Sequence, residues 1–596
     1  MNIGKTVVWA AAVAAGVTVG CATSEKGGED AAAKEPAFAI ELGPKDVLRD
    51  LSKTTTAPVI GYAGVMCEGG APDYLLVSNR QMTARAFRQS GAWLLRQWGA
   101  NQWWEQGYYG RKLAAEGKAL KDAKGKPVKL PIDPHDLFTF LKQNDLKALF
   151  TLEVWGGWDV ETAGPNMTPE AIRRGIVDYV TWIKTNGYES VVAGFELGNE
   201  TYFNPHPEAI ATNWLAVVPE IRRIMPKVKL GIPLGEYTDD DPDFQAVARR
   251  WRTEEQNAAH DKMDFETEVV RSISARFIKA LHPVMKDITH VIYHGYGAEK
   301  PWSATMYGIN RWRKFRDRFD DTRGKPMWIT EWRERSDEDV RCHRRYNEGL
   351  WRAHYLMMAL AQPDIEALNL HGFDCQAGAF NWAHDGAYHV QWDTANRNYP
   401  DCDWIRGEER LEQGLTGVIY RYFAAALRRC PVVLAHGDSK GKNTDDSCYD
   451  CTRFYGSLMH RRLDIEHGVA EPTNVVGEVE WLALANNREW SRANVLALLM
   501  VNSTDRPQKV RVNLEGKVPF QPIYRALTCD AEFLDRSSVP GETKPWRTIA
   551  WEAESTVGKR YNGWEWGPLQ PDELIVEIGP KTIQTVTIPL DNAKKK

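Results

Sequence analysis

Two glutamates occupy positions from which a pair of carboxyl groups could act together. Glu200 follows the apolar run that ends at Leu197, and Glu331 follows the run that ends at Thr330. Short apolar runs of this kind are typical of buried strands. Cleavage of a glycosidic bond needs two carboxyl groups, because one protonates the leaving oxygen while the other, ionised, attacks the anomeric carbon. Glu200 and Glu331 are therefore candidates for such a pair.

The elements that would position the two glutamates alternate along most of the chain. Short β-rich runs are separated by amphipathic helical stretches, which predicts an α/β fold with a (β/α)8 TIM barrel. Glu200 and Glu331 follow the fourth and seventh predicted strands, so both would reach the C-terminal mouth of the barrel. The predicted strands are Val59–Tyr62, Ala92–Gln97, Ala148–Val154, Val191–Leu197, Lys229–Pro233, Thr289–His294, Met327–Thr330 and Ala367–Leu370.

The pattern changes after Cys430. Short strand-like runs separated by turn residues, with little helical periodicity, predict a C-terminal antiparallel β-sandwich. We predict a catalytic barrel over residues 46–430 and a sandwich over residues 431–596. Residues 22–45 form a tether that contains a candidate sandwich strand at Phe38–Leu42.

The segments around the two glutamates resemble clan A of the retaining glycoside hydrolases. The segment Glu196–Glu200 is similar to the heparanase-like β-glucuronidases. The segments Thr330–Trp332 and His294–Tyr296 are similar to the β-xylosidase and α-L-iduronidase family. The appended sandwich resembles those families and the α-L-arabinofuranosidases. Because no single family fits throughout, the sugar is not inherited from any of them.

The resemblance implies roles for the residues that match its motifs. Glu200 would be the acid/base and Glu331 the nucleophile of a double displacement that retains the anomeric configuration. Asn199 would hydrogen-bond the 2-hydroxyl of the sugar. Arg96, at the end of the second predicted strand, would hold Glu331 ionised through its positive charge.

Three further residues receive binding roles from the same resemblance. Tyr296, with His294 as the alternative, would orient Glu331 from the sixth strand. Trp382, after the eighth strand, would form the floor of the subsite that holds the cleaved sugar. No metal and no cofactor is expected for this chemistry.

The segment after the second predicted strand offers hints about the substrate. It contains Trp103 and Trp104, which we predict to lie in a long loop and to stack on sugar rings. Residues 101–130 hold seven Lys or Arg against three Asp or Glu, and Arg333 follows the nucleophile closely. Guanidinium groups bind carboxylate and sulfate in bidentate fashion. The hypothesis is an anionic glycan, either uronic or sulfated. An arabinose- or xylose-containing glycan, with a merely solvated charged loop, is the alternative.

The N-terminus predicts export. A basic residue and a short apolar run lead to Thr18–Cys21, which resembles a bacterial lipobox. The resemblance implies a lipoprotein signal over residues 1–21 with Cys21 as the lipidated residue, and a plain signal peptide is the alternative. The residues after Cys21 lack the Asp that often signals retention in the inner membrane, which favours the outer membrane. The net charge of -5 argues against general nucleic-acid binding.

Two other functions use the same features. A non-catalytic carbohydrate-binding lipoprotein on a degenerate barrel would be expected to lack a catalytic glutamate, and both are present. A transglycosylase would use the same residues, with a sugar hydroxyl in place of water as the acceptor. Carbohydrate is the expected partner in each case, and the sequence does not indicate an oligomeric state.

Overall fold

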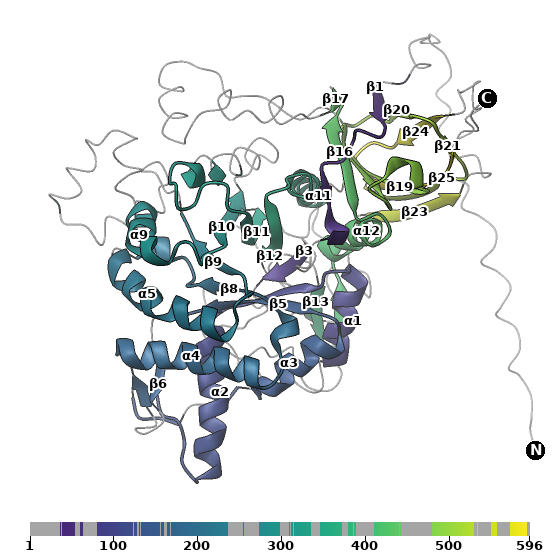
Figure 1. The fold of residues 1–596 in the computed structure, drawn as a ribbon. Coiled ribbons are helices and arrows are strands. Elements are labelled where there is room, and N and C mark those ends of the chain that lie inside the picture. Colours follow the sequence, from purple (N-terminus) through teal and green to yellow (C-terminus); the bar gives the residue numbers. More distant parts are fainter. Residues whose placement is uncertain are drawn as a thin grey trace, which may run out of the picture.

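The computed structural model describes a barrel and a sandwich that pack against each other (Figure 1). Apart from short breaks and a few single residues, the described ranges are 38–53, 60–63, 80–235, 273–297, 309–334, 346–371, 380–388, 410–442, 479–529, 550–556 and 572–592. The lipobox with Cys21 lies outside them. Within the described residues, no helix combines the length and the apolar character that a membrane span needs.

Eight parallel strands close into a barrel, which confirms the predicted fold class. Its interior is filled by a layer of apolar side chains that includes Trp328, which is 2% exposed. Gly194 and Gly231 make room for this indole, because a Cβ atom would lie 2.4 Å and 2.9 Å from its ring atoms. In chain order the strands are β3 (Ile60–Ala63), β4 (Leu94–Gln97), β5 (Lys147–Leu152), β8 (Val192–Leu197), β9 (Leu230–Pro233), β10 (His290–Gly297), β11 (Met327–Glu334) and β12 (Ile365–His371).

Helices surround the barrel, and α4 shows how local sequence sets the ends of a helix. The hydroxyl of Thr168 caps α4 by accepting a hydrogen bond from the amide of Ala171, and a proline occupies the first turn. Gly187, with φ 68°, follows the end of this helix. The described helices are α1 (Arg80–Ser90), α2 (Ala100–Ala115), α3 (Pro134–Gln143), α4 (Pro169–Thr185), α5 (Pro207–Ile224), α9 (Ile273–Leu281), α11 (Tyr346–Leu360) and α12 (Leu415–Arg429).

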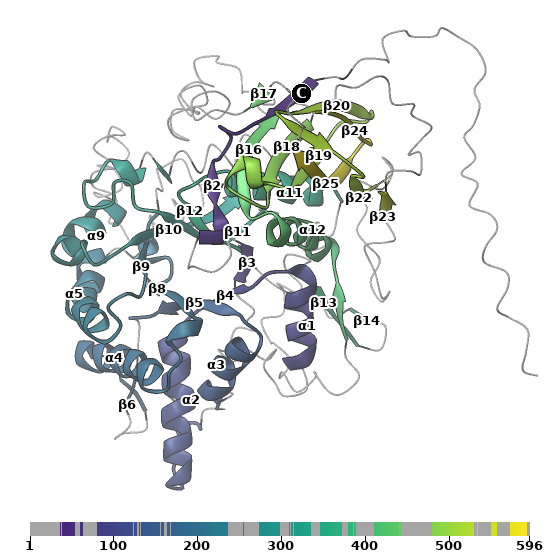
Figure 2. The ribbon, with the colours of Figure 1, turned by 45° about the vertical axis from the view of Figure 1, so that its right-hand side comes forward.

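The sandwich has two sheets of different size, and the smaller contains β1, β20 and β24. In the larger sheet the order is β17-β16-β18-β19-β25-β22-β23, with β2 and β21 at its margins. Figure 1 shows β1 beside β20, with which it pairs in parallel, while the other sandwich pairs are antiparallel. In Figure 2 the strands β16, β18, β19 and β25 of the larger sheet lie side by side. The bounds are β1 (Phe38–Leu42), β2 (Arg49–Asp50), β16 (Val432–Asp438), β17 (Gly441–Lys442), β18 (Val479–Ala485), β19 (Val495–Asn502), β20 (Gln508–Leu514), β21 (Lys517–Pro519), β22 (Ile523–Thr528), β23 (Trp551–Thr556), β24 (Glu573–Ile578) and β25 (Thr582–Asn592).

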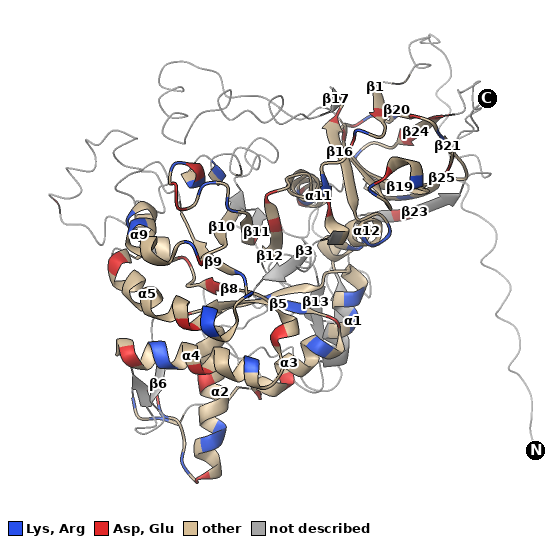
Figure 3. Cartoon of the chain, viewed as in Figure 1, with Lys and Arg blue, Asp and Glu red and all other residues tan. Residues whose placement is uncertain are grey.

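The burial of the two sheets differs because of what covers them. In β20 buried residues alternate with partly exposed ones, as in a sheet that is covered on one face. Every residue of β18 is buried, since one face packs on the smaller sheet and the other on α11 and α12 of the barrel. Figure 3 shows charged residues of both signs on outer helices such as α4. The strand β19, in the centre of the larger sheet, contains no charged residue.

Small elements complete the description. The strands β6 (Gly157–Asp159) and β7 (Gly164–Asn166) form a hairpin after β5. The strands β13 (Phe380–His384), β14 (Ala387–Tyr388) and β15 (Arg410–Gln413) form a small sheet after β12. The short 3-10 helices are η2 (Leu51–Lys53), η4 (Glu189–Val191), η5 (Thr201–Phe203), η6 (His282–Val284) and η9 (Trp490–Arg492).

Candidate active site

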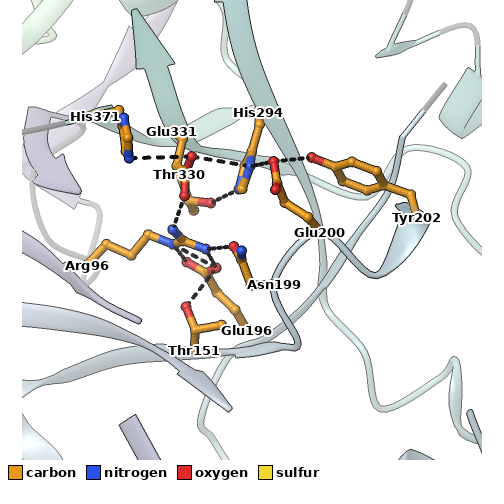
Figure 4. A network of polar contacts seen from close by, with 10 residues as sticks. All are labelled: Arg96, Thr151, Glu196, Asn199, Glu200, Tyr202, His294, Thr330, Glu331 and His371. Atoms are coloured by element: carbon orange, nitrogen blue, oxygen red, sulfur yellow. Dashed lines mark hydrogen bonds and ion pairs between the residues drawn. The ribbon is translucent and has the colours of Figure 1, made fainter. Parts of the chain in front are cut away.

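Arg96 is the centre of a buried network at the C-terminal end of the barrel strands (Figure 4). Its Nε and Nη2 donate to the carboxylate of Glu196 at 2.8–2.9 Å, and Nη2 also donates to Oδ1 of Asn199 at 2.8 Å. Its Nη1 donates to Oε1 of Glu331 at 2.5 Å, so the predicted contact between Arg96 and Glu331 is present. The hydroxyl of Thr151 adds a hydrogen bond to Glu196 at 3.1 Å.

Charge keeps this network together. Burial alone would lower the pKa of Arg96, but the charges of Glu196 and Glu331 outweigh it and raise the pKa above its ordinary value. The guanidinium therefore stays positive and faces two carboxylates in a site that is shielded from water. One arginine thus fixes the side chains of two glutamates that come from different strands.

A tight turn after β8 presents Asn199 and Glu200. Gly198 has φ 95°, and a Cβ atom there would lie 2.5 Å from the side chain of Thr201. Glu200 itself has φ 46°, a left-handed conformation that costs a non-glycine residue roughly 1 kcal/mol or more. This backbone strain is located at the residue that the sequence predicts to be catalytic.

A β-bulge sets the direction of Glu331. Tyr293 of β10 pairs with Ile329 of β11, but the next residue, His294, pairs with Glu331, so Thr330 is the extra residue. Bulges of this kind re-aim side chains next to active sites. As a result Glu331 lies beside His294 and faces Glu200 across the barrel mouth.

The two glutamates are close and differ in exposure. One oxygen of Glu200, one oxygen of Glu331 and one ring nitrogen of His294 all lie within 4.8 Å of one another. The side chain of Glu200 is 31% exposed, whereas that of Glu331 is 11% exposed. Glu200 also accepts a hydrogen bond from the hydroxyl of Tyr202 at 3.0 Å. A substrate would reach Glu200 more easily, while Glu331 is more buried and is held by Arg96.

His294 connects the two glutamates. Its Nδ1 lies 3.0 Å from Oε1 of Glu200 and 3.5 Å from Oε2 of Glu331. Burial alone would lower the pKa of His294, but the charges of Glu331 and Glu200 raise it above the ordinary value of 6.5. The imidazole is therefore protonated over a wider pH range than a free histidine.

Replacement of His294 by asparagine is expected to destabilise the protein most at acidic to neutral pH. Because the folded-state pKa is raised, the histidine contributes its full stability below pH 6.5 and loses it as the pH rises through the folded value. The expected loss is about 1–2 kcal/mol at pH 6, shrinking by pH 9. Urea unfolding of wild type and variant across this range measures it, and a constant difference would contradict the assignment.

Glu153 lies next to the network but has a different environment. It is 1% exposed, and its carboxyl oxygens have no hydrogen bond of good geometry among the described residues, since the backbone of Asn199 and the side chain of Trp98 contribute only weakly. Burial raises the pKa of Glu153 to about 8, against the opposing charge of Arg96. Near neutral pH this carboxyl group is mainly protonated, unlike the paired Glu196.

Replacement of Glu153 by glutamine is expected to stabilise the protein, and the gain should increase with pH. The folded state retains a proton that the unfolded state releases above pH 4.5, so wild-type stability falls between pH 4.5 and about 8. The variant avoids this loss, which amounts to about 3 kcal/mol at pH 7. Glu196→Gln is the matched control, because it leaves Arg96 underpaired and should destabilise. Urea unfolding at pH 4.5, 7 and 8 measures both, and destabilisation by Glu153→Gln would overturn the prediction.

The cluster of Glu200, His294 and Glu331 is also, within the described residues, a group with the spacing of metal ligands. Arg96 argues against this use, since its positive charge already contacts Glu331 and would repel a cation. The predicted absence of a metal stays a prediction.

The structure corrects one part of the sequence prediction. Trp103 and Trp104 lie in α2 and not in a loop, and they are 3% and 1% exposed. Trp104 packs against Tyr179 and Trp182 of α4, so neither indole is free to stack on a sugar. The apolar positions of α2 recur at helical spacing and bury this face of the helix in the core.

Other predicted binding residues are placed only in part. Tyr296 and Arg333 lie in β10 and β11, and Trp382 lies in β13, but their side chains fall outside the described part of the structure. The sequence interpretation did not include Tyr202, which bonds Glu200, or His371, whose Nε2 lies 3.8 Å from Glu331. His371 ends β12, one residue beyond the predicted strand. Its position at the end of a barrel strand could have identified it as a candidate site residue.

Comparisons with known proteins identify the fold. No protein-family model and no curated protein matches the sequence. A thermostable GH51 α-L-arabinofuranosidase from Thermotoga petrophila is similar in structure, with a TM-score of 0.56 and 11% identity over 92% of this chain and 99% of that chain. An α-L-arabinofuranosidase from Thermotoga maritima, solved as an arabinose complex, gives 0.55 and 12% over the same shares.

A third solved structure gives the same result. A family 51 α-L-arabinofuranosidase from Bifidobacterium longum has a TM-score of 0.52 and 9% identity over 92% of this chain and 97% of that chain. At such low identity the likeness shows the fold alone. It spans barrel and sandwich together, so the two-domain fold implied by the resemblance to clan A glycoside hydrolases is confirmed.

Proposed function

We propose that this protein is a retaining glycoside hydrolase that cleaves a poly- or oligosaccharide by double displacement. The observation that carries the proposal is the spacing of Glu200 and Glu331, which have carboxyl oxygens within 4.8 Å of each other. Retaining enzymes hold their two carboxyl groups about 5–5.5 Å apart, whereas inverting enzymes leave about 6.5–9.5 Å for a water molecule.

In the first step Glu200 acts as the acid. Its Oε1 contacts the hydroxyl of Tyr202 and Nδ1 of His294, so we assign the transferable proton to Oε2. This proton goes to the glycosidic oxygen as the bond to the anomeric carbon breaks. Glu331 attacks the same carbon from the opposite face and forms a glycosyl ester, while Arg96 holds its Oε1 in place.

In the second step Glu200 acts as the base. It takes a proton from water, and the water oxygen attacks the anomeric carbon and releases Glu331. Asn199 has its Oδ1 held by Arg96, so its amide NH2 is oriented for a substrate hydroxyl. Two displacements restore the original anomeric configuration.

Two classes of substrate remain in the proposal. The structural neighbours described as arabinofuranosidases support an arabinose- or xylose-containing glycan. The arginine that follows the nucleophile, Arg333, supports a uronic or sulfated glycan through bidentate binding of its anionic groups. The burial of Trp103 and Trp104 removes them as support for either class.

A release screen tests the function and the substrate together. Aryl glycosides and plant and algal polysaccharides are incubated with wild type, Glu200→Ala and Glu331→Ala. If the wild type releases sugar from one substrate class and both variants lose this activity, the result supports the proposal and identifies the sugar. Binding of glycans without any cleavage across the panel would favour a carbohydrate-binding protein instead.

We also propose that Cys21 carries a lipid anchor and that the protein is exported to the outer membrane. The support is the lipobox-like segment Thr18–Cys21 and the absence of Asp directly after it. Expression in a bacterium with labelled palmitate measures the modification. Label on wild type and none on Cys21→Ser is expected, and equal labelling of both would overturn the anchor.

A further inference from the structure

A single turn of 3-10 helix places a tyrosine beside Glu200. Glu200, with φ 46°, directly precedes η5, so Tyr202 lies only two residues further along the chain. The helix η5 packs against α5 and α9, and the hydroxyl of Thr201 lies 3.5 Å from the carbonyl oxygen of Pro233. Tyr202 is 3% exposed, and its hydroxyl points at Glu200 (Figure 4). The packing of the barrel therefore fixes the position of this ring.

Tyr202 and His294 meet at one oxygen of Glu200. The hydroxyl of Tyr202 donates to Oε1 at 3.0 Å, and Nδ1 of His294 lies 3.0 Å from the same oxygen. The two rings are arranged edge to face, with their centroids 6.3 Å apart and an angle of 84° between their planes. An oxygen that accepts two hydrogen bonds is not the one that carries the acidic proton. Oε2 is therefore the oxygen that can present the proton to a substrate.

Without such contacts the carboxyl group of Glu200 would be free to turn. The last torsion of a glutamate side chain is broad and two-fold, so its two oxygens exchange places at low cost. The side chain of Glu200 is 31% exposed, against 11% for Glu331, so packing restrains it less. A general acid must lie within about 2.6–3.2 Å of the atom that receives its proton. Hydrogen bonds to Oε1 supply the restraint that this distance requires.

We propose that Tyr202 is a positioning residue for the acid/base of the hydrolase. It holds Oε1 of Glu200, so that Oε2 gives its proton to the glycosidic oxygen in the first step and takes a proton from water in the second. Tyr202 keeps its own hydroxyl proton throughout. The inference rests on the proposed function, because Tyr202 acts only through Glu200.

Leaving groups of different basicity test this role. A phenyl glycoside needs a proton on its leaving oxygen, whereas a 2,4-dinitrophenyl glycoside releases a stable anion that needs none. Both are prepared for α-L-arabinofuranose, β-D-xylose and β-D-glucuronic acid, which represent the two proposed substrate classes. The quantity measured is kcat/KM, which reports the step that forms the glycosyl ester. The ratio of the values for the two leaving groups is independent of the fraction of protein that is folded.

The variants are Tyr202→Phe, Glu200→Ala and the double variant Glu200→Ala/Tyr202→Phe. Tyr109→Phe is the matched control, because the buried hydroxyl of Tyr109 in α2 also donates to a carboxylate, that of Asp178 in α4, at 2.8 Å. The double variant separates two kinds of role. A residue that acts through Glu200 has no further effect once Glu200 is absent, whereas a residue that supports the fold does.

Tyr202→Phe is expected to lower kcat/KM about tenfold for the phenyl glycoside and less than about twofold for the dinitrophenyl glycoside. The loss for the phenyl glycoside should be smaller than in Glu200→Ala, because His294 still contacts Oε1. The double variant should match Glu200→Ala, and Tyr109→Phe should match wild type.

The outcomes separate this inference from the proposed function. If Glu200→Ala shows the leaving-group dependence, then equal losses for both leaving groups in Tyr202→Phe, no loss, or a further loss in the double variant would overturn the inference alone. Equal losses for both leaving groups in Glu200→Ala, or a wild type that cleaves none of the probes, would overturn the proposed function and this inference with it.

Discussion

Replacement of Glu331 by alanine is expected to lower kcat about 10⁵-fold on the substrate that the release screen identifies. The variant lacks the oxygen that attacks the anomeric carbon, so the covalent route is closed, although substrate binding by the rest of the site remains. Steady-state kinetics of an activated aryl glycoside measure the loss. Because Arg96 still pairs with Glu196, the variant should fold.

Added azide separates the two catalytic roles. In Glu331→Ala the small anion can occupy the space of the lost carboxylate and attack directly, giving a glycosyl azide of inverted configuration. In Glu200→Ala it should attack the covalent intermediate and give a glycosyl azide of retained configuration. The same configuration from both variants, or full activity of Glu331→Ala, would contradict the assignment of Glu331 as nucleophile.

The second large effect is expected from Arg96→Met. This change removes the positive charge between Glu196 and Glu331, both of which are buried. Uncompensated buried charges cost about 3–5 kcal/mol when one partner of an ion pair is removed. The free energy of unfolding should fall by that amount at pH 7, as measured by urea titration.

The double variant Arg96→Met/Glu196→Gln is the control for this effect. It removes one of the two stranded carboxylates, so it should recover part of the stability that Arg96→Met loses. The stability should recover without any return of catalytic activity, because Glu331 still lacks the guanidinium of Arg96. An Arg96→Met variant as stable as wild type would show that the network contributes little to folding.

The barrel and the position of the catalytic pair could both be predicted from the sequence. The periodicity of the strands and helices indicates the barrel, and the order of the strands places Glu200 and Glu331 at the same mouth. The fourth predicted strand ends at Leu197, as β8 does, and the fifth ends at Pro233, as β9 does. In a closed parallel barrel, the end of each strand lies at one mouth. Residues such as Arg96 and Glu331, which lie far apart in sequence, could therefore be placed together before any contact was known.

Other features depend on packing that the sequence pattern does not show. The bulge at Thr330 arises from pairing between β10 and β11, and it decides that His294 lies opposite Glu331. The segment with Trp103 was predicted to be a loop, but it forms α2 although it contains glycines, which lower helix propensity. Gly110 is needed there for close contact, since a Cβ atom would lie 2.2 Å from the side chain of Leu130.

The stereochemistry of the first product tests the double displacement most directly. Proton NMR spectra are recorded within minutes of adding enzyme to an aryl glycoside of the identified sugar, before the released sugar mutarotates. If Glu331 forms a covalent intermediate that water resolves with the help of Glu200, the first anomer to appear has the configuration of the substrate. First appearance of the opposite anomer would mean a single displacement by water, and would contradict the roles of both glutamates.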